Sequence, residues 1–286
     1  MVFNETETAK NTQEDCNDFI GEDGLLYCGK CQTRKQMRGF NFLTRQEGIV
    51  PVACACVTAF RIQREEEERQ EARKAFVNTL RRSCIADESY RALTFDSDDG
   101  NGDRDAVNMA RLYVEHWDEC SAQKIGCLFS GMPGSGKTFL ACCIANALID
   151  KGIEALVTTI PALITDMTAD FEANKPEVLQ RISNVDLLVL DDLGAERATG
   201  YITEKLFEII DARYRSGKPL IVTTNLSTAE LKSPSSLEYK RIFDRIIELC
   251  CQPVQVRGES RRLGKAQEKA AFFRQLLKTT RTDTKH

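Results

Sequence analysis

The chain has 286 residues, of which 42 % are apolar, so it is long enough for one large domain or two unequal domains with a buried core. Its formal net charge of −4 at pH 7 gives no overall positive field that would attract nucleic acid or an acidic membrane. No apolar run approaches the roughly 18 residues of a membrane-spanning helix, and the polar N-terminus does not resemble a secretion signal, so we expect a soluble, cytoplasmic protein without a membrane partner.

The two ends of the chain differ in charge. Residues 1–23 hold seven acids and one base, whereas residues 257–286 hold nine bases and three acids. Residues 1–24 have almost no large apolar side chains and predict a disordered acidic tail. Residues 266–286 predict a basic helix or tail, which either is simply solvated or contacts a polyanion.

Four cysteines form two tight pairs within residues 25–56, in the patterns C-x-x-C and C-x-C: Cys28, Cys31, Cys54 and Cys56. Because we expect reduced thiols in a chain of this size without an export signal, metal ligands are a better interpretation than disulfides. Four thiolates complete a tetrahedral Zn²⁺ shell with no open position, which predicts a structural site. A [4Fe–4S] cluster and buried free thiols are the alternatives. Zinc would supply much of the folding free energy of so small a unit.

A long helix is predicted after the cysteine unit. Residues 57–83 contain no Gly or Pro and are rich in helix formers, so they predict an exposed helix within a linker over residues 57–89. A polar loop at residues 96–105 and a helix from about Ala106 to Cys120 follow.

From Ile125 onward, short apolar runs alternate with helical stretches. The runs lie at residues 125–130, 155–160, 186–192 and 219–225, and the helical stretches lie at about 137–150, 161–182 and 200–216. Strands that alternate with helices predict an α/β fold with a mainly parallel sheet covered on both faces. From about residue 235 we expect helix, interrupted near Gln252–Gly258 by a short strand at Pro253–Val256.

The first apolar run leads into the phosphate-binding pattern G-x-x-x-x-G-K-[ST]. The candidate phosphate-binding residues are Gly131, Met132, Pro133, Gly134, Ser135, Gly136, Lys137, Thr138 and Phe139. The glycines let the loop curl so that its N–H groups face phosphate oxygens, and the next helix directs its positive end there. Lys137 would reach the β- and γ-phosphates of ATP, and Thr138 would bind Mg²⁺. The strand–loop–helix context disfavours the alternative, a chance glycine-rich turn.

Two later strands end in polar residues. The run Leu187–Leu190 is followed by Asp191 and Asp192, and the run at residues 220–224 is followed by Asn225. Because the carboxyl ends of parallel strands lie beside the phosphate loop, Asp191 would hold Mg²⁺ through water and Asp192 would orient or deprotonate the attacking water. Asn225 would hydrogen-bond that water or the γ-phosphate, unless it is simply a loop-starting residue.

The segments GMPGSGKT, LLVLDDLG, IVTTN and RIFDRI, in this order and spacing, resemble the AAA+ ATPases. Within them, the chain is similar to the DnaC-type helicase loaders, with their phage and prophage relatives, and to the neighbouring IstB transposition ATPases. The resemblance covers about residues 90–265 and implies a P-loop AAA+ domain there. The cysteine cluster, the Glu/Arg-rich helix and the motif Leu93–Asp96 extend it upstream.

The resemblance implies roles for two arginines. Arg245 occupies the arginine-finger position, from which it would reach the ATP of a neighbouring subunit in a spiral oligomer. From the sequence alone, a solvated helix face shared with Arg241 is the simpler interpretation. Arg262 matches the sensor-2 arginine that contacts the γ-phosphate, although the family usually has an aromatic residue where Arg261 stands. The family's second acid is commonly Glu, so the shorter Asp192 suggests slow hydrolysis.

The resemblance also implies partners. ATP-bound subunits would assemble, bind single-stranded DNA and hold a replicative DNA helicase through the N-terminal region. An extra helical insertion corresponds to Pro161–Ile182, with Thr159, Thr165 and Lys175 as candidate DNA contacts, and a plain surface helix is the equal alternative. Two other functions stay open: a transposition helper ATPase of the IstB kind, which would bind duplex DNA and a transposase, and a zinc-stabilised adaptor that binds ATP but scarcely hydrolyses it.

Overall fold

The computed structural model describes residues 17–41, 45–169, 174–194, 199–234, 236–258, 260 and 269–274. The chain divides into two compact units, Met1–Ala75 and Phe76–His286. Among the described residues, no helix is long and apolar enough to cross a membrane. Of the basic C-terminal segment, residues 269–274 are helical, whereas the rest of residues 266–286 and most of the acidic tail lie outside the described residues.

Two short antiparallel hairpins open the first unit. β1 (Phe19–Ile20) pairs with β2 (Leu26–Tyr27), and β3 (Gln36–Asn41) pairs with β4 (Gln46–Pro51). The Phe19 ring stacks on that of Tyr27, with the ring centroids 5.6 Å apart. The predicted end of the disordered tail at residue 24 is therefore wrong, because residues 17–24 contribute a strand and an aromatic contact to the cysteine-containing unit.

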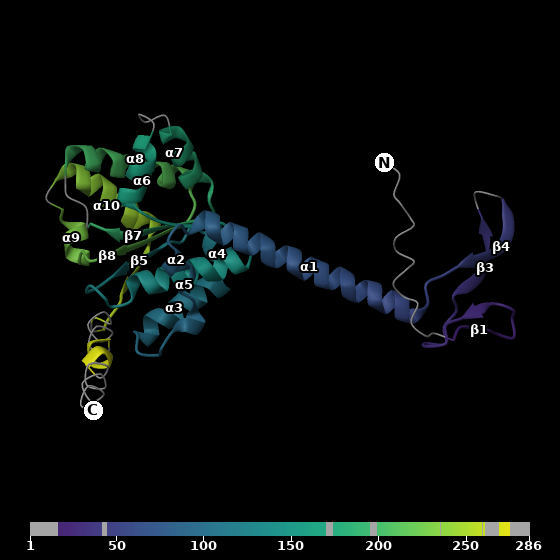
Figure 1. Ribbon diagram of the computed structural model, residues 1–286. Helices are drawn as coiled ribbons and strands as arrows, with labels where there is room; N and C mark the ends of the chain where they lie inside the picture. Colours follow the sequence, from purple (N-terminus) through teal and green to yellow (C-terminus); the bar gives the residue numbers. More distant parts are fainter. Residues whose placement is uncertain are drawn as a thin grey trace, which may run out of the picture. The chain divides into compact units, whose positions relative to one another are not determined.

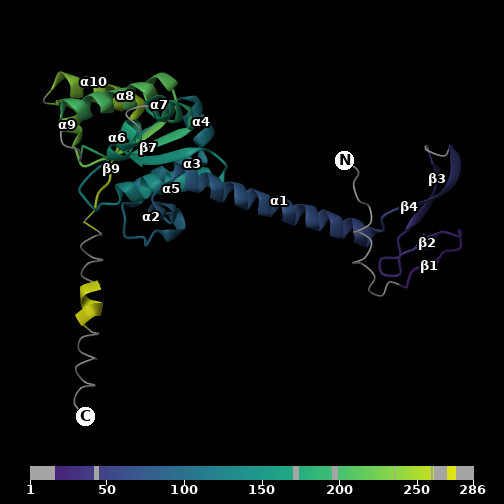
Figure 2. The same cartoon turned by 45° about the horizontal axis from the view of Figure 1, so that its top comes forward.

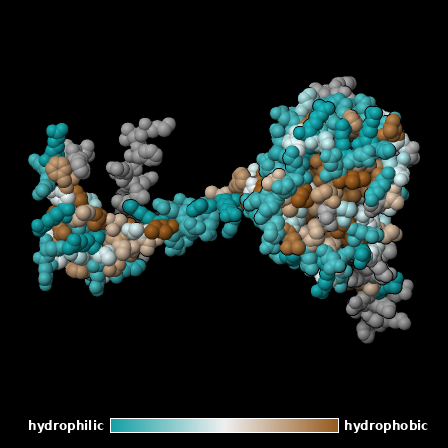
Figure 3. Space-filling model, turned by 180° about the vertical axis from the view of Figure 1, so that it is seen from behind, coloured by the Kyte–Doolittle hydropathy of each residue, from teal (hydrophilic) through white to brown (hydrophobic). Residues whose placement is uncertain are grey.

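Helix α1 (Ala55–Cys84) confirms the exposed helix predicted at residues 57–83. Its middle is hydrophilic (Figure 3), and Arg64 and Glu68, one turn apart, form an ion pair of 2.8 Å. Its end differs, since Leu80 and Cys84 are buried in the core of the second unit. The second compact unit begins at Phe76, before the start at residue 90 that the sequence predicts for the ATPase domain, because the apolar end of the linker helix packs into this unit.

The second unit is built on a five-stranded sheet in the order β6-β7-β8-β5-β9, in which every pair is parallel. The strands are β5 (Cys127–Ser130), β6 (Ala155–Thr159), β7 (Leu187–Leu193), β8 (Leu220–Thr224) and β9 (Gln252–Gln255). All five match apolar runs or strands predicted from the sequence. The predicted α/β class with a mainly parallel sheet is confirmed.

Helices cover both faces of this sheet (Figures 1 and 2). One face carries the end of α1 with α3 (Arg104–Glu115), α4 (Trp117–Ala122) and α5 (Lys137–Asp150). The other face carries α6 (Ile160–Thr168), α7 (Lys175–Asn184), α8 (Gly200–Ser216), α9 (Thr228–Lys232) and α10 (Leu237–Leu249). Alternation along β7 sets the two layers, since Leu187 and Val189 join the first core and Leu188 and Leu190 the second.

Two helices predicted as continuous are broken. The stretch predicted at Ala106–Cys120 divides at His116 into α3 and α4, and the break directs Trp117 into the core, where its ring meets Tyr113 edge-on at 5.9 Å. The stretch predicted at residues 161–182 divides into α6 and α7. There Ala169 leaves the helical region, with φ −57° and ψ 143°, and α7 starts with a proline in its first turn.

A short connection joins α1 to α3. It holds α2 (Glu88–Arg91) and the 3₁₀ helix η1 (Phe95–Ser97). Asp103 ends it, because its carboxylate accepts hydrogen bonds from the backbone N–H groups of Asp105 and Ala106 and so caps α3. The second oxygen of Asp103 accepts a hydrogen bond of 2.8 Å from the backbone N–H of Arg257, which fixes the connection beside the chain that follows β9.

Candidate functional site

The predicted phosphate loop lies between β5 and α5, and glycine fixes its curl. Gly131, Gly134 and Gly136 have φ values of 150°, 84° and 107°, which other residues rarely adopt. A Cβ atom on Gly131 would lie 2.4 Å from the carbonyl oxygen of Val256, and one on Gly134 would lie 2.4 Å from Oγ of Ser260. The loop therefore needs glycine for both conformation and space, and the N-terminus of α5 follows it directly.

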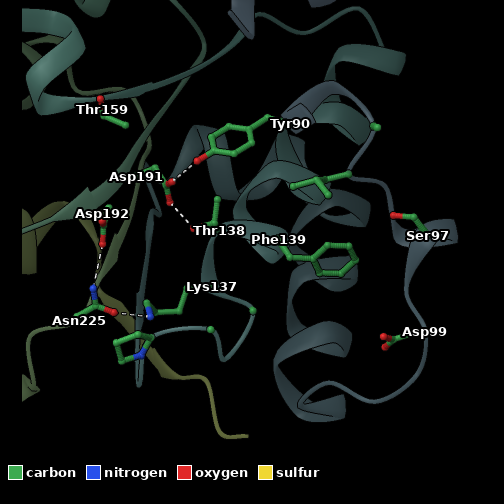
Figure 4. Close-up of a pocket in the computed structure, with 15 residues that line it drawn as sticks. Tyr90, Ser97, Asp99, Lys137, Thr138, Phe139, Thr159, Asp191, Asp192 and Asn225 are labelled. Carbon is green, nitrogen blue, oxygen red and sulfur yellow. Dashed lines mark hydrogen bonds between the residues drawn. The ribbon is translucent and has the colours of Figure 1, made fainter. Parts of the chain in front are cut away.

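Lys137 points back into this loop. Its Nζ donates hydrogen bonds to the carbonyl oxygens of Gly131 (2.9 Å) and Met132 (3.0 Å) and to Oδ1 of Asn225 (2.8 Å), as Figure 4 shows for Asn225. The amide of Asn225 in turn donates to Oδ1 of Asp192 at 3.0 Å. Three residues predicted for the site, from α5, from β7 and from the loop after β8, thus form one hydrogen-bonded chain.

Asp191 collects three hydroxyl groups. Its Oδ1 accepts hydrogen bonds from Thr138 (2.8 Å) and Thr223 (2.6 Å), and its Oδ2 accepts one from Tyr90 (3.0 Å). Figure 4 shows the hydrogen bonds from Thr138 and Tyr90. The side chain is buried, with 4 % of its residue surface exposed. A carboxylate and a hydroxyl at 2.8 Å are the hard oxygen ligands that Mg²⁺ takes, so Asp191 and Thr138 fit the predicted magnesium site.

A bulge separates the two consecutive acids. The register between β7 and β8 shifts between Leu190 and Leu193, and Asp192 has a positive φ of 58°. A bulge re-aims side chains along a strand, and Asp tolerates this backbone region better than most residues. Asp191 therefore faces the buried hydroxyl groups, whereas Asp192 is exposed and faces Asn225.

A cavity of about 510 Å³ opens above these groups (Figure 4). It is lined by Tyr90, Ala92, Leu93, Ser97, Asp99, Pro133, Gly134, Gly136, Lys137, Thr138, Phe139, Thr159, Asp191, Asp192 and Asn225. Gly131, Met132 and Ser135 complete the loop without lining the cavity. Ser135 is buried, and its Oγ has no hydrogen-bond partner among the described residues.

The sequence did not predict the side chains of Tyr90, Thr223 and Asn146, which hold Asp191 and its surroundings. Tyr90 and Thr223 both donate to Asp191, and Asn146 in α5 donates to the carbonyl oxygens of Tyr90 and Leu93, each at 2.9 Å. Thr223 lies within the TTN run, where the spacing to Asn225 could have signalled it. Neither Tyr90 nor Asn146 belongs to a recognisable pattern, because both act through chain segments far apart in sequence.

Of the two predicted arginines, the structure describes Arg245, which does not line the cavity. Arg245 in α10 forms an ion pair of 2.9 Å with Asp211 of α8, and its guanidinium lies over the rings of Phe207 (4.6 Å) and Tyr214 (5.5 Å). This position away from its own cavity suits a residue that acts on a neighbouring subunit, and that role stays a prediction. Arg262 lies outside the described residues.

The candidate DNA contacts have interactions within the chain. Thr159 lines the cavity and caps α6, since its Oγ1 accepts a hydrogen bond from the backbone N–H of Ala162. The hydroxyl of Thr165 donates to the carbonyl oxygen of Pro161 at 2.9 Å. Lys175 forms an ion pair of 2.7 Å with Glu208. These interactions explain the three side chains structurally, and contact with DNA stays a prediction.

The four predicted metal ligands come together in the first unit. The sulfur atoms of Cys28, Cys31, Cys54 and Cys56 all lie within 4.8 Å of one another. Those of Cys28 and Cys56 are 3.6 Å apart, and those of Cys54 and Cys56 are 3.2 Å apart. A tetrahedral shell with Zn–S bonds of about 2.3 Å places its sulfurs roughly 3.8 Å apart. The cluster therefore fits a closed, structural zinc site.

The surroundings of the cluster favour ionised sulfur at Cys31 and disfavour it at Cys56. The sulfur of Cys31 lies 3.0 Å from the hydroxyl of Thr33, and this hydrogen bond, with others from backbone N–H groups, lowers the pKa of Cys31 to about 5. Hydrogen bonds with Cys54 and Cys28 raise the pKa of Cys56 to about 12. The four sulfur atoms thus differ in basicity, and a bound cation would ionise all of them.

A protein-family model described as IstB-like ATP binding protein matches residues 59–270 of this chain. The replicative helicase loader DnaC of Escherichia coli (strain K12) is 32 % identical over 173 residues, which span 59 % of this chain and 65 % of DnaC, less than two thirds of its length. The protein of the same name from Buchnera aphidicola subsp. Acyrthosiphon pisum is 31 % identical over 192 residues, which span 65 % of this chain and 75 % of that protein.

Solved structures show a similar fold. The crystal structure of DnaI has a TM-score of 0.52 at 25 % identity, covering 63 % of this chain and 98 % of that chain. A putative primosome component from Streptococcus pyogenes serotype M3 also has a TM-score of 0.52 at 25 % identity, covering 64 % of this chain and 97 % of that chain. The likeness covers an AAA+-like sheet with flanking helices.

Proposed function

The chain belongs to the family of IstB-like ATP binding proteins, and we propose that it is an ATP-hydrolysing helicase loader. It would bind ATP with Mg²⁺, single-stranded DNA and a replicative DNA helicase. One observation carries the enzymatic part of this proposal: Lys137, Thr138, Asp191, Asp192 and Asn225 converge on one cavity from separate elements of the fold.

The residues of the cavity divide the work of phosphoryl transfer. The Nζ of Lys137 lies between two loop carbonyls and Asn225, and phosphate oxygens would replace the carbonyls as its partners. Mg²⁺, when bound by Thr138 and Asp191, would neutralise charge on the phosphates. The exposed carboxylate of Asp192 would accept a proton from the attacking water or orient it, and the amide of Asn225 holds that carboxylate in place.

The other part of the proposal concerns partners. Two relatives that match this chain over 65 % and 75 % of their own length are named replicative helicase loaders. We propose the same activity for this chain. The cysteine unit, stabilised by zinc, would contact the helicase. Arg245 would complete the site of a neighbouring subunit, so the active form would be an oligomer.

A transposition helper ATPase is the second candidate, because the matching family model takes its name from IstB-like proteins. A pull-down with a replicative helicase as bait separates the two. Capture of the parent, lost in Cys28→Ser with Cys31→Ser, supports the loader. Failure to bind the helicase, together with preferential binding of duplex DNA, would favour the helper.

Hydrolysis tests the enzymatic part. We expect Asp192→Asn to lower the ATPase rate by about 10²-fold while nucleotide still binds, because only the proton acceptor is lost. Asp118→Asn, an exposed acid in α4, is the matched control and should hydrolyse ATP as the parent does. The rates are measured with and without single-stranded DNA. If the parent and both variants hydrolyse ATP only at the background rate, with and without single-stranded DNA, the protein is not an ATPase. The remaining candidate function is then a nucleotide-binding adaptor.

A further inference from the structure

A hydroxyl group from outside the recognised motifs reaches the candidate magnesium site. Tyr90 lies in α2, lines the cavity and donates a hydrogen bond of 3.0 Å to Oδ2 of Asp191 (Figure 4). A tyrosine phenol has an ordinary pKa of about 10 and is protonated at neutral pH. Tyr90 is therefore a permanent donor to this carboxylate.

The hydrogen bonds of Asp191 show what this donor does. A carboxylate offers about four lone-pair sites. Thr138 and Thr223 take the two on Oδ1, and Tyr90 takes one of the two on Oδ2. One site on Oδ2 is left for a water molecule of a hydrated cation. The final torsion of an Asp side chain is soft, so without Tyr90 the direction of Oδ2 would depend on bonds to the other oxygen alone.

Tyr90 is itself held by α5 and α1. The buried amide of Asn146 donates to the carbonyl oxygens of Tyr90 (2.9 Å) and Leu93 (2.9 Å), and its Oδ1 accepts a hydrogen bond of 3.1 Å from Nε of Arg81. Arg81 stands in the last turn of α1 and also pairs with Asp150 of α5. A continuous series of contacts thus runs from the end of α1 through α5 and α2 to the end of β7.

We propose that Tyr90 is a positioning residue for the magnesium-binding carboxylate of Asp191, and that Asn146 and Arg81 make its position depend on helix α1. The inference rests on the proposed Mg²⁺·ATP site. α1 is one continuous helix from Ala55 to Cys84, and Arg81 stands in its last turn.

The test compares Tyr90→Phe with the parent in two titrations. The first measures the Mg²⁺ concentration that gives half-maximal binding and hydrolysis of ATP, and the second measures affinity for a fluorescent ATP analogue in EDTA. We expect the half-maximal Mg²⁺ concentration to rise about tenfold, as for loss of a hydrogen bond to a charged group, with affinity in EDTA unchanged. Tyr113→Phe is the matched control, because it removes a phenol that donates to Ile125, outside the cavity.

Arg81→Gln tests the connection to α1. It should raise the half-maximal Mg²⁺ concentration in the same direction, and its effect should not add to that of Tyr90→Phe, since both act through one contact. Independent, additive effects would overturn the connection. Unchanged magnesium dependence in Tyr90→Phe, or an equal loss of affinity in EDTA, would overturn the positioning role. A parent that binds no nucleotide even with Mg²⁺ would instead refute the proposed function.

Discussion

Asp191 and Asp192 are neighbours in sequence, yet their carboxylates lie in different surroundings. Asp191 is buried among three hydroxyl groups, whereas Asp192, with φ of 58°, is exposed and accepts a hydrogen bond from the amide of Asn225. The buried oxygens suit a cation, and the exposed carboxylate can meet water in the cavity. The bulge in β7 therefore directs the carboxylates of Asp191 and Asp192 into different surroundings, where one suits a cation and the other a water molecule.

We expect the phosphate loop to require glycine at position 134. In Gly134→Ala the new methyl group would lie 2.4 Å from Oγ of Ser260, and φ of 84° would cost about 1–2 kcal/mol. We expect ATP affinity to fall at least about tenfold, because the loop must shift to relieve the contact. Titration with a fluorescent ATP analogue measures this.

Gly100→Ala is the control for that variant. Gly100 also has a positive φ, of 75°, but nothing lies within 4 Å of its added Cβ. It should lose stability without losing ATP affinity. If Gly134→Ala and the parent bind the ATP analogue with equal affinity, the backbone conformation of the loop is not needed for phosphate binding.

At the scale of elements, the sequence predicts well wherever local signals mark both ends of a helix. α8 runs from Gly200 to Ser216, as expected, because Thr199 caps its start and Gly217, with φ of 63°, ends it. The predicted single helix at 106–120 is wrong because the break at His116 serves tertiary packing of Trp117, which periodicity does not reveal.

We expect the folding of the cysteine unit to depend on a bound metal. Two short hairpins bury few apolar side chains, so a bound metal should supply much of the folding free energy. We expect the parent to carry about one Zn²⁺ per chain. Cys28→Ser with Cys31→Ser should lose the metal and unfold residues 17–56, as seen by elemental analysis and by hydrogen exchange of the backbone amides.

Cys251→Ser is the control, because Cys251 is an exposed thiol outside the cluster. It should keep the metal and the protection of residues 17–56. A parent without metal that is nevertheless folded over these residues would refute the zinc interpretation.

In the whole molecule, the sequence predicts the phosphate loop after β5 and the polar residues at the ends of β7 and β8. It does not predict the side chains that other elements pack around them. Lys137, Asp191, Asp192 and Asn225 lie where the order of strands and motifs places them, at one cavity. Tyr90 could not be predicted, because it reaches Asp191 across 101 positions of the sequence through the packing of α2 on α5. Contacts of this kind follow from the tertiary fold and leave no local pattern.

Two variants that each damage a different part of the site test whether Arg245 acts on a neighbouring subunit. Lys137→Ala removes the phosphate-binding lysine of a subunit but keeps its Arg245. Arg245→Ala removes the arginine but keeps the phosphate-binding lysine. If Arg245 acts on a neighbour, each variant alone should hydrolyse ATP at background rate, and a mixture should recover activity because the first variant lends its arginine to the second.

Arg215→Ala is the matched control for the mixture. Arg215 also pairs with Asp211, at 2.8 Å, but its side chain is 78 % exposed. It should be as active as the parent without any mixing. Full activity of Arg245→Ala on its own would contradict a role between subunits.

We propose that the loop from Gly131 to Thr138 binds the phosphates of ATP. Titration of the parent, Lys137→Ala and the exposed-lysine control Lys124→Ala with a fluorescent ATP analogue in the presence of Mg²⁺ tests it most directly. We expect the parent and Lys124→Ala to bind the analogue and Lys137→Ala not to bind it, because Nζ of Lys137 is the cation at the centre of the loop. Micromolar affinity retained in Lys137→Ala would contradict it.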